Sequence, residues 1–140
     1  MPSVRKIYRQ GNTPIISLPP NVLRLVGAGI GTTLIIYPVN DLTLIAEVNN
    51  LTPDTPLNLD RINAMRAVIA RQIYRQGNSF VCSISAFMLE RVGIGVGDYL
   101  SITPISDNAF TLTAKSAAQV SYEQSQGRIP YRKAERANQG

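Results

Sequence analysis

The sequence predicts a mainly β fold with short helices, in which two tandem repeats pack on each other as an intramolecular pseudo-dimer. The first reason is internal repetition: residues 5–41 recur as residues 71–107, with 17 of 37 aligned positions identical and no gap. The second is the β-like alternation of apolar and polar residues in both copies. The third is size, because a unit of about 45 residues is too small to bury its apolar faces alone.

Repeat one, residues 1–48, carries a clear order of signals. Residues 4–9 alternate as a strand does, and the Gln-Gly-Asn turn at 10–12 suits glycine and asparagine, which tolerate positive φ. A second strand is expected over 15–18. Pro19 and Pro20 then open a short helix, where a missing N–H costs little, and Gly27 is placed to cap it. A hairpin of strands 32–39 and 42–48, turning at 40–41, completes the repeat.

Repeat two, residues 71–115, predicts the same elements in the same order. Strands are expected over 73–75 and 80–84, a helix over 86–92, and a closing hairpin over 99–105 and 109–114. We expect its turn at 106–108 to be longer than the matching turn of repeat one.

Two further segments lie outside the repeats. The linker, residues 49–70, begins as a Pro- and Asn-rich loop, and Asn58 or Asp60 then looks like the N-cap of a short helix with Ile62, Met65 and Ile69 at helical spacing. Residues 116–140 are polar and net basic, which predicts a flexible basic tail. Three outcomes remain open for this tail: disorder, a helix, or ordering on a partner.

The composition restricts the chemistry available to the chain. Histidine is absent and Cys82 is the single cysteine, so a Ser-His-Asp or Cys-His arrangement is impossible and no zinc-type ligand cluster exists. The nine carboxylates are scattered, without a pair suited to acid–base work. We therefore expect no enzyme activity, no cofactor and no metal. Cys82 replaces Ile16 within an apolar strand, which favours a buried, inert thiol over a nucleophile.

A glycine motif in each repeat invites a phosphate-binding interpretation, which we set aside. Residues 27–31 read Gly-Ala-Gly-Ile-Gly, and residues 93–97 read Gly-Ile-Gly-Val-Gly. A phosphate loop needs a strand before it and a helix after it, so that the helix N-terminus meets the anion. Here a helix precedes and a strand follows, so the glycines are better explained as helix cap and connector.

Charge and the lack of targeting signals indicate the environment. The net charge is +5 and the pI is about 9.7, which favours an anionic partner, nucleic acid first, although a solvated basic surface without a partner gives the same numbers. A lone cysteine fits a reducing compartment, no apolar run approaches a membrane helix, and the first residues lack a signal-peptide core. We expect a soluble cytoplasmic protein with no membrane partner.

The ordered motifs resemble the AbrB/SpoVT/MazE swapped-hairpin family. The resemblance rests on Val-Arg-Lys-Ile at 4–7, Ile-Ser-Leu-Pro at 16–19 and Leu-Arg-Leu-Val-Gly at 23–27, with Val-Gly-Ile at 92–94 and Gly-Asp at 97–98 in repeat two. It covers residues 4–48 and 71–115. It implies two swapped-hairpin repeats in one barrel, as in tandem MraZ-type proteins, and double-stranded DNA binding as a transcription regulator or antitoxin.

The resemblance also implies which residues contact DNA. The family's contacts come from the first strand, the turn and the helix, which map onto Arg5, Lys6 and Arg24 in repeat one and Arg71 in repeat two. Asn12 and Asn78 stand where the family often has a turn arginine. Gln72 replaces Lys6, Glu90 replaces Arg24 and Ser85 replaces Pro19, so the two copies differ at these positions.

The residues themselves point to the same turns. Arg9 and Arg75 each precede an exposed Gln-Gly-Asn turn, and arginine reads guanine or phosphate while Gln and Asn read adenine. The alternative is that duplication simply kept a structural turn.

Two functions follow. The favoured one is a sequence-specific or semi-specific DNA-binding regulator with two unequal half-sites, working as a monomeric pseudo-dimer or a higher homo-oligomer. The other is a non-enzymatic interaction module, antitoxin-like, that binds a protein partner through residues 116–140.

Overall fold

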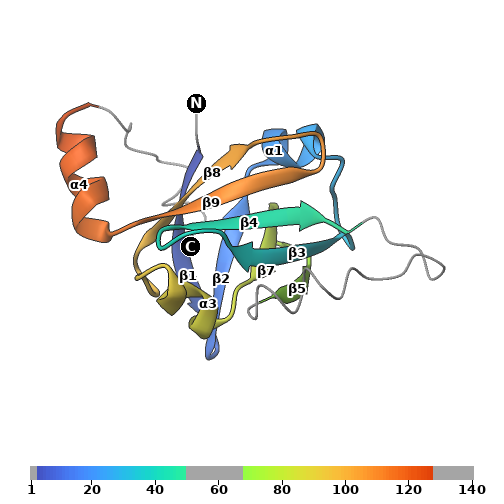
Figure 1. Ribbon diagram of the computed structural model, residues 1–140, viewed down its shortest axis with the longest axis horizontal. Coiled ribbons are helices and arrows are strands. Elements are labelled where there is room, and N and C mark those ends of the chain that lie inside the picture. Colours follow the sequence, from blue (N-terminus) through green and yellow to red (C-terminus); the bar gives the residue numbers. More distant parts are fainter. Residues whose placement is uncertain (1–2, 50–67, 128–140) are drawn as a thin grey trace.

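The strands of the protein form one nearly closed antiparallel sheet, as the mainly β prediction requires (Figure 1). The computed structural model describes residues 3–49 and 68–127. Within these residues the strands are β1 (Ser3–Gln10), β2 (Thr13–Leu18), β3 (Thr33–Pro38), β4 (Thr43–Val48), β5 (Ile69–Gln72), β6 (Tyr74–Gln76), β7 (Ser79–Ser83), β8 (Tyr99–Pro104) and β9 (Ala109–Lys115). Their order in the sheet is β5-β3-β4-β9-β8-β1-β2-β7-β6. Only Ile73 separates β5 from β6, so the two edges of the sheet meet at one stretch of chain and the sheet curls into a barrel.

The two repeats share the barrel rather than forming one half each. β1 of repeat one pairs with β8 of repeat two, and β5 of repeat two pairs with β3 of repeat one. β2 pairs with β7, and β4 pairs with β9, which are again contacts between repeats. The other pairings, β1·β2, β3·β4, β6·β7 and β8·β9, lie within one repeat. Half of the eight pairings therefore join the repeats, so neither repeat can satisfy its backbone hydrogen bonds alone.

The pairing registers obey a two-fold pseudo-symmetry. Exchanging the repeats, by adding 66 to each residue of repeat one and subtracting 66 from each residue of repeat two, turns the β1·β8 register, where Arg5 faces Leu100, into the β5·β3 register, where Arg71 faces Leu34. The same operation maps the β2·β7 and β4·β9 registers onto themselves. The pseudo-dyad therefore passes between Ile16 and Cys82 in one wall and leaves between Ile45 and Thr111 in the opposite wall.

The two closing hairpins turn in the same way, which corrects the expectation of a longer turn at 106–108. Val39 N donates to Thr43 O and Ile105 N donates to Ala109 O, both at 3.0 Å. These pairs are 66 residues apart, so the alignment of the repeats continues without a gap through β4 and β9. The two turns have equal length because both close a hairpin of the same register.

Three helices accompany the barrel in the described part of the chain: α1 (Pro20–Leu25), α3 (Ala86–Arg91) and α4 (Ala117–Ser125). α1 and α3 are the helices predicted within the repeats, and each buries one apolar side in the common core. Their N-caps differ: the Ser85 side chain accepts from Met88 N at 3.1 Å, whereas Pro19 provides no side-chain cap. Pro19 instead fixes the extended entry into the helix.

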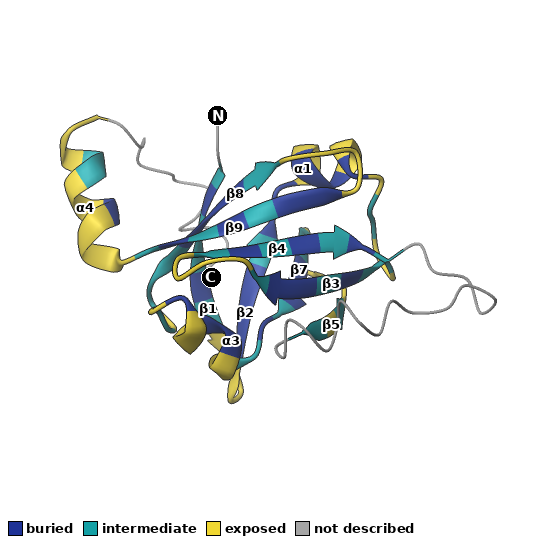
Figure 2. Ribbon diagram, in the orientation of Figure 1, coloured by how far each residue is buried: buried dark blue, intermediate teal, exposed yellow. Residues whose placement is uncertain are grey.

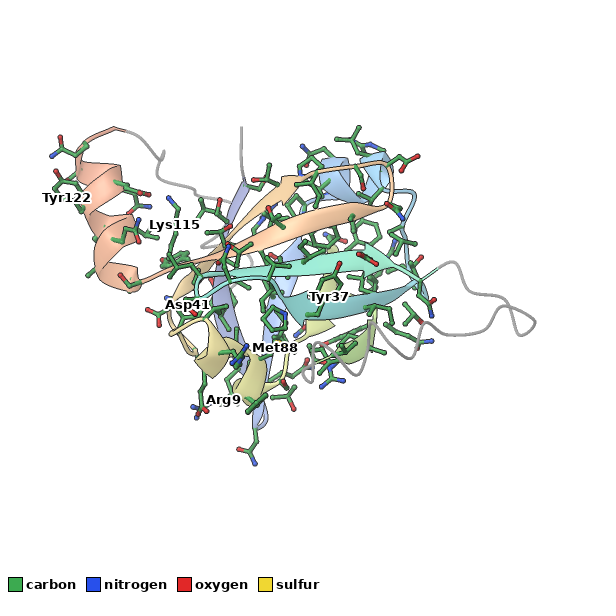
Figure 3. All side chains as sticks on the ribbon, in the orientation of Figure 1. Arg9, Tyr37, Asp41, Met88, Lys115 and Tyr122 are labelled. Carbon is green, nitrogen blue, oxygen red and sulfur yellow. The ribbon has the colours of Figure 1, made fainter. Side chains whose placement is uncertain are left out.

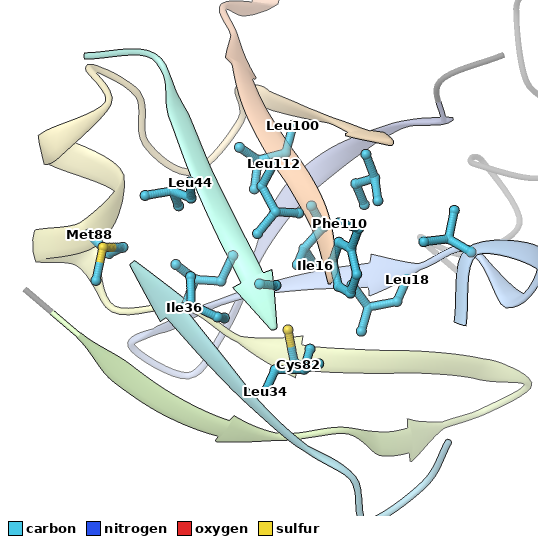
Figure 4. Packing of buried hydrophobic residues seen from close by; sticks show 14 of the residues in the cluster. Ile16, Leu18, Leu34, Ile36, Leu44, Cys82, Met88, Leu100, Phe110 and Leu112 are labelled. Atoms are coloured by element: carbon cyan, nitrogen blue, oxygen red, sulfur yellow. The ribbon is translucent and has the colours of Figure 1, made fainter. Parts of the chain in front are cut away.

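A single apolar cluster fills the barrel (Figure 4). It draws from every strand pair, and Ile16, Leu34, Ile36, Leu44, Cys82, Leu100, Ile102 and Phe110 are all fully buried. Phe110 faces Ala46 across β9·β4, whereas the symmetry-related pair is Leu112 with Leu44. One pair thus joins a large side chain to a small one, whereas the symmetry-related pair joins two leucines. The repeats have therefore diverged in a way that keeps the core filled. In Figure 2 buried and half-buried residues alternate along the barrel strands, while α4 is mainly exposed.

The linker and tail depart from the sequence expectations where they are described. Ile69 belongs to β5 and pairs with Ile36, so it is not part of a linker helix, and the strand begins inside the segment assigned to the linker. The expected helix start at 58–60 lies outside the described residues. In the predicted flexible tail, residues 117–125 form α4, because Ser116 caps the helix and Val120 is buried. Residues 128–140 lie outside the described part.

Candidate nucleic-acid interface

The outer surface of strands β1, β2, β7 and β6, called here the hairpin face, has the same chemistry on both sides of the pseudo-dyad. Cross-strand partners in an antiparallel sheet point to the same face. Ile16 and Cys82 pair with each other and are buried, so their side chains point into the barrel. The alternate residues point outward. These are Tyr8, Gln10, Thr13, Ile15 and Ser17 from repeat one, and Tyr74, Gln76, Ser79, Val81 and Ser83 from repeat two. The face is therefore neutral, hydroxyl- and amide-rich, and nearly symmetric.

Two tyrosines cover the centre of the hairpin face. Tyr8 is the cross-strand neighbour of Ile15, and Tyr74 is that of Val81. Although they lie on the outer face, Ile15 and Val81 are only 8% and 4% exposed, as expected if bulky neighbours shield them. These two apolar residues are thus covered although they lie on the outer side of the barrel.

Polar contacts hold these tyrosines in place. Tyr74 Oη donates to Gln10 Oε1 at 2.8 Å, and this bond joins the two repeats across the face. Burial, and to a smaller extent Cys82, raises the pKa of Tyr74, which keeps its hydroxyl protonated as a donor. Lys6 Nζ lies 5.7 Å from the centroid of the Tyr8 ring, at the distance of a cation–π contact.

The two Gln-Gly-Asn turns lie at opposite ends of the β2·β7 ribbon. Leu18 pairs with Phe80, and because the strands are antiparallel the register places Asn78 opposite position 20. Asn12 lies eight residues before that position. Eight residues therefore separate the turns along the ribbon, or roughly 26 Å at 3.3 Å a residue. Both asparagines are exposed, and both turns are built on left-handed glycines, Gly11 (φ 62°) and Gly77 (φ 61°).

Strand exchange brings the helix of one repeat to the turn of the other. Ile84, just before α3, donates its amide to Pro14 O beside the first turn, at 3.0 Å. Figure 3 shows Arg9 at this end of the barrel, below α3. At the other end, the β7 residue Phe80 pairs with Leu18 just before α1. Arg24 of repeat one therefore lies at the end that carries Arg75 and Asn78 of repeat two.

Sequence reasoning missed a basic residue at the first end. Arg91 is exposed in the last turn of α3, one position after Glu90, the counterpart of Arg24. Aligning Arg24 with Glu90 suggested that this end had lost its helix arginine. The next residue supplies it, since neighbouring positions in the exposed last turn of a short helix serve the same end of the barrel. The sequence does contain Arg91 in the last turn of the predicted helix, but an alignment of the repeats residue by residue compares only Glu90 with Arg24.

Arg5 and Arg71 lie deeper than Arg9 and Arg75. All four start from the inward side of their strands, where their partners are Leu100, Leu34, Pro14 and Phe80 in that order. Arg9 and Arg75 are exposed beside the turns at the ends of the barrel, whereas Arg5 and Arg71 are half-buried. The Arg71 charge also acts to lower the pKa of Cys82, which places it near the core. We therefore leave these two arginines out of the hairpin face.

Charge is segregated between the two walls of the barrel. The first hairpins of the repeats, residues 3–18 and 69–83, contain five basic residues and no acidic one. The closing hairpins, residues 33–48 and 99–115, contain three acidic residues (Asp41, Glu47 and Asp107) and one basic residue, Lys115. Lys115 is itself paired with Glu123 at 2.7 Å. The wall that carries the hairpin face is thus the one suited to an anion.

The described residues show no sign of a metal centre or a membrane-crossing helix. Over 3–49 and 68–127, no three His, Cys, Asp or Glu side chains are grouped to hold a metal ion. No helix in the same residues has the length and apolar character needed to cross a bilayer. Comparisons with protein-family models, curated proteins and solved structures gave no match for this chain.

Proposed function

We propose that this chain is a tandem swapped-hairpin protein of the AbrB-like type. The support is the strand exchange: the β3–β4 hairpin of repeat one pairs on both flanks with strands of repeat two, β5 and β9, and the β8–β9 hairpin is held in the same way by β1 and β4. A dimer of two separate chains with interleaved hairpins would have this pairing pattern, with the pseudo-dyad as its true dyad.

On this fold we infer a double-stranded DNA-binding protein, acting as a transcription regulator. The single observation that carries the proposal is the charge segregation: of the two walls that the pseudo-dyad crosses, the acid-free one is flanked by both Gln-Gly-Asn turns. A two-fold protein surface matches the two-fold symmetry of duplex DNA, so both ends can meet equivalent parts of the backbone.

Each end of the hairpin face contributes comparable contacts. Arg9 and Arg91 serve one end, Arg24 and Arg75 the other, and Lys6 borders the face beside Tyr8. These side chains bind phosphates or guanine edges, while the amides of the turns bind base edges. Glu90 at the first end and its counterpart Arg24 at the second make the two half-sites unequal.

Fluorescence anisotropy with duplex fragments over a salt series tests the proposal. If about five phosphates are neutralised, the logarithm of affinity falls with the logarithm of salt at a slope of roughly −4.5. Absence of binding to genomic duplex fragments at low salt would overturn it. Binding of single strands in preference to the duplex would also overturn it, since the symmetry argument applies only to a duplex.

A further inference from the structure

The Tyr74–Gln10 hydrogen bond is unusual in its reach. Gln10 is on β1 and Tyr74 is on β6, three strands away in the order β1-β2-β7-β6. The registers place Tyr74 opposite Val81 and, through it, in line with Ser17, whereas Gln10 faces Thr13, four residues away along β2. The bond therefore crosses the β2·β7 ribbon diagonally, from the turn end of β1 to β6.

The bond fixes an otherwise mobile amide. Gln10 is exposed and its side chain has three rotatable bonds, so without a partner it would sample many orientations. Tyr74 has far less freedom, because its ring packs at the nearly buried Val81. The hydroxyl uses one lone pair of Gln10 Oε1. No other hydrogen bond to this amide occurs within residues 3–49 and 68–127, so the second lone pair and both hydrogens of Nε2 can meet a ligand.

We propose that Gln10 reads an adenine through the major groove, and that Tyr74 is the positioning residue that orients its amide. Adenine presents N7 as acceptor and N6 as donor, which the free Nε2 hydrogen and the remaining Oε1 lone pair match together. The inference rests on the proposed DNA-binding function and names the base that one half-site recognises. The phosphate contacts supply affinity at both ends, and Gln10 supplies selectivity at one position.

The test begins by selecting the preferred duplex from a random library with the full-length protein. The preferred site is expected to contain an adenine whose replacement by another base weakens binding about tenfold. Replacing that adenine with 7-deazaadenine, which lacks only N7, should cost most of the same factor. In Gln10→Ala both penalties should vanish, while binding to an unrelated duplex and its salt slope stay as in the wild type.

Tyr74→Phe separates positioning from packing, because it keeps the ring over Val81 and removes only the hydroxyl. It should reduce the discrimination for adenine by roughly 2- to 10-fold without changing the affinity for unrelated duplex. Tyr8→Phe is the matched control across the pseudo-dyad and should leave that adenine preference intact. Circular dichroism establishes that each variant is folded.

The outcomes distinguish this inference from the proposed function. If the wild type binds duplex DNA but Gln10→Ala keeps the full adenine preference, the base-reading role is wrong and DNA binding stands. If Tyr74→Phe keeps the preference and Gln10→Ala loses it, Tyr74 does not position the amide. If the wild type binds no duplex at all, the proposed function fails before the question of base reading arises.

Discussion

Cys82 lies on the pseudo-dyad opposite Ile16, and its thiol gives a direct test of how dry the barrel core is. Burial raises its pKa from 9.0 to about 12, and the Arg71 charge opposes this only in part. Above pH 9 the unfolded chain releases the thiol proton while the folded chain retains it. The unfolded state then binds fewer protons, so stability is lost as pH rises.

The size of this loss follows from the two pKa values. Between pH 8 and pH 10 the unfolded thiol titrates through its pKa of 9.0, whereas the folded thiol stays protonated. The free energy of unfolding should therefore fall by about 1.4 kcal/mol over this range on account of Cys82 alone. Burial also raises the pKa of Tyr74, but this tyrosine is kept in any variant of Cys82.

Urea unfolding of the wild type and of Cys82→Ala, at pH 8 and at pH 10, isolates the contribution of the thiol. The alanine variant is less stable at both pH values because it leaves a cavity, but that cost does not depend on pH. The wild type should lose about 1.4 kcal/mol more than the variant between the two pH values. Equal losses in the two proteins would show that the thiol reaches water in the folded state, and the account of a sealed core would be wrong.

Four further substitutions, the last of them a control, test the contacts and turns that stabilise the fold. Asp98→Ala should lower the free energy of unfolding, measured with urea, by about 1–3 kcal/mol. The reason is that the Asp98 carboxylate accepts hydrogen bonds from a backbone amide of the preceding loop and from one of α4. Unchanged stability would show that these two bonds contribute little. Glu123→Gln removes the ion pair with Lys115 and should cost about 0.5–1 kcal/mol, with faster hydrogen exchange in α4 as the direct readout. Gly77→Ala should lower the free energy of unfolding by about 1–2 kcal/mol, because φ at Gly77 is 61°. Gly95→Ala should lower it clearly less, because Gly95 has no positive φ and a Cβ there meets open space. Thermal melts in which Gly95→Ala is the less stable variant would refute the strain argument.

The repeat predicted most of the local structure but not how the two copies meet. Alternation and turn residues place the strands within each repeat, because these signals act over a few neighbours. The pairing of β1 with β8, and of β3 with β5, joins residues more than 30 positions apart, and no local pattern specifies such a partner. Strand exchange is also why Arg24 lies at the end that carries Arg75 rather than at the end with Arg9.

The first strand shows why the contact residues were harder to predict. Val4 and Ile7 are both buried although they lie on opposite faces of β1: Ile7 shares the inward face with Arg5, whereas Val4 lies on the outer face, opposite the buried Ser101. Alternation in the sequence does not reveal that the outer face is also covered at this point. Arg5 and Lys6 therefore look equivalent, although Arg5 points inward and Lys6 lies beside Tyr8.

The central claim is that the hairpin wall, and not the opposite wall, meets DNA. It is tested by measuring the salt dependence of duplex binding for Arg9→Gln/Arg75→Gln, with Lys115→Gln on the opposite wall as control. Each lost phosphate contact should reduce the steepness of the salt dependence by about 0.9, so the slope of the double variant should change from roughly −4.5 to about −2.7 while the control keeps the wild-type value. An unchanged slope in the double variant, or an equal change in the control, would contradict the account.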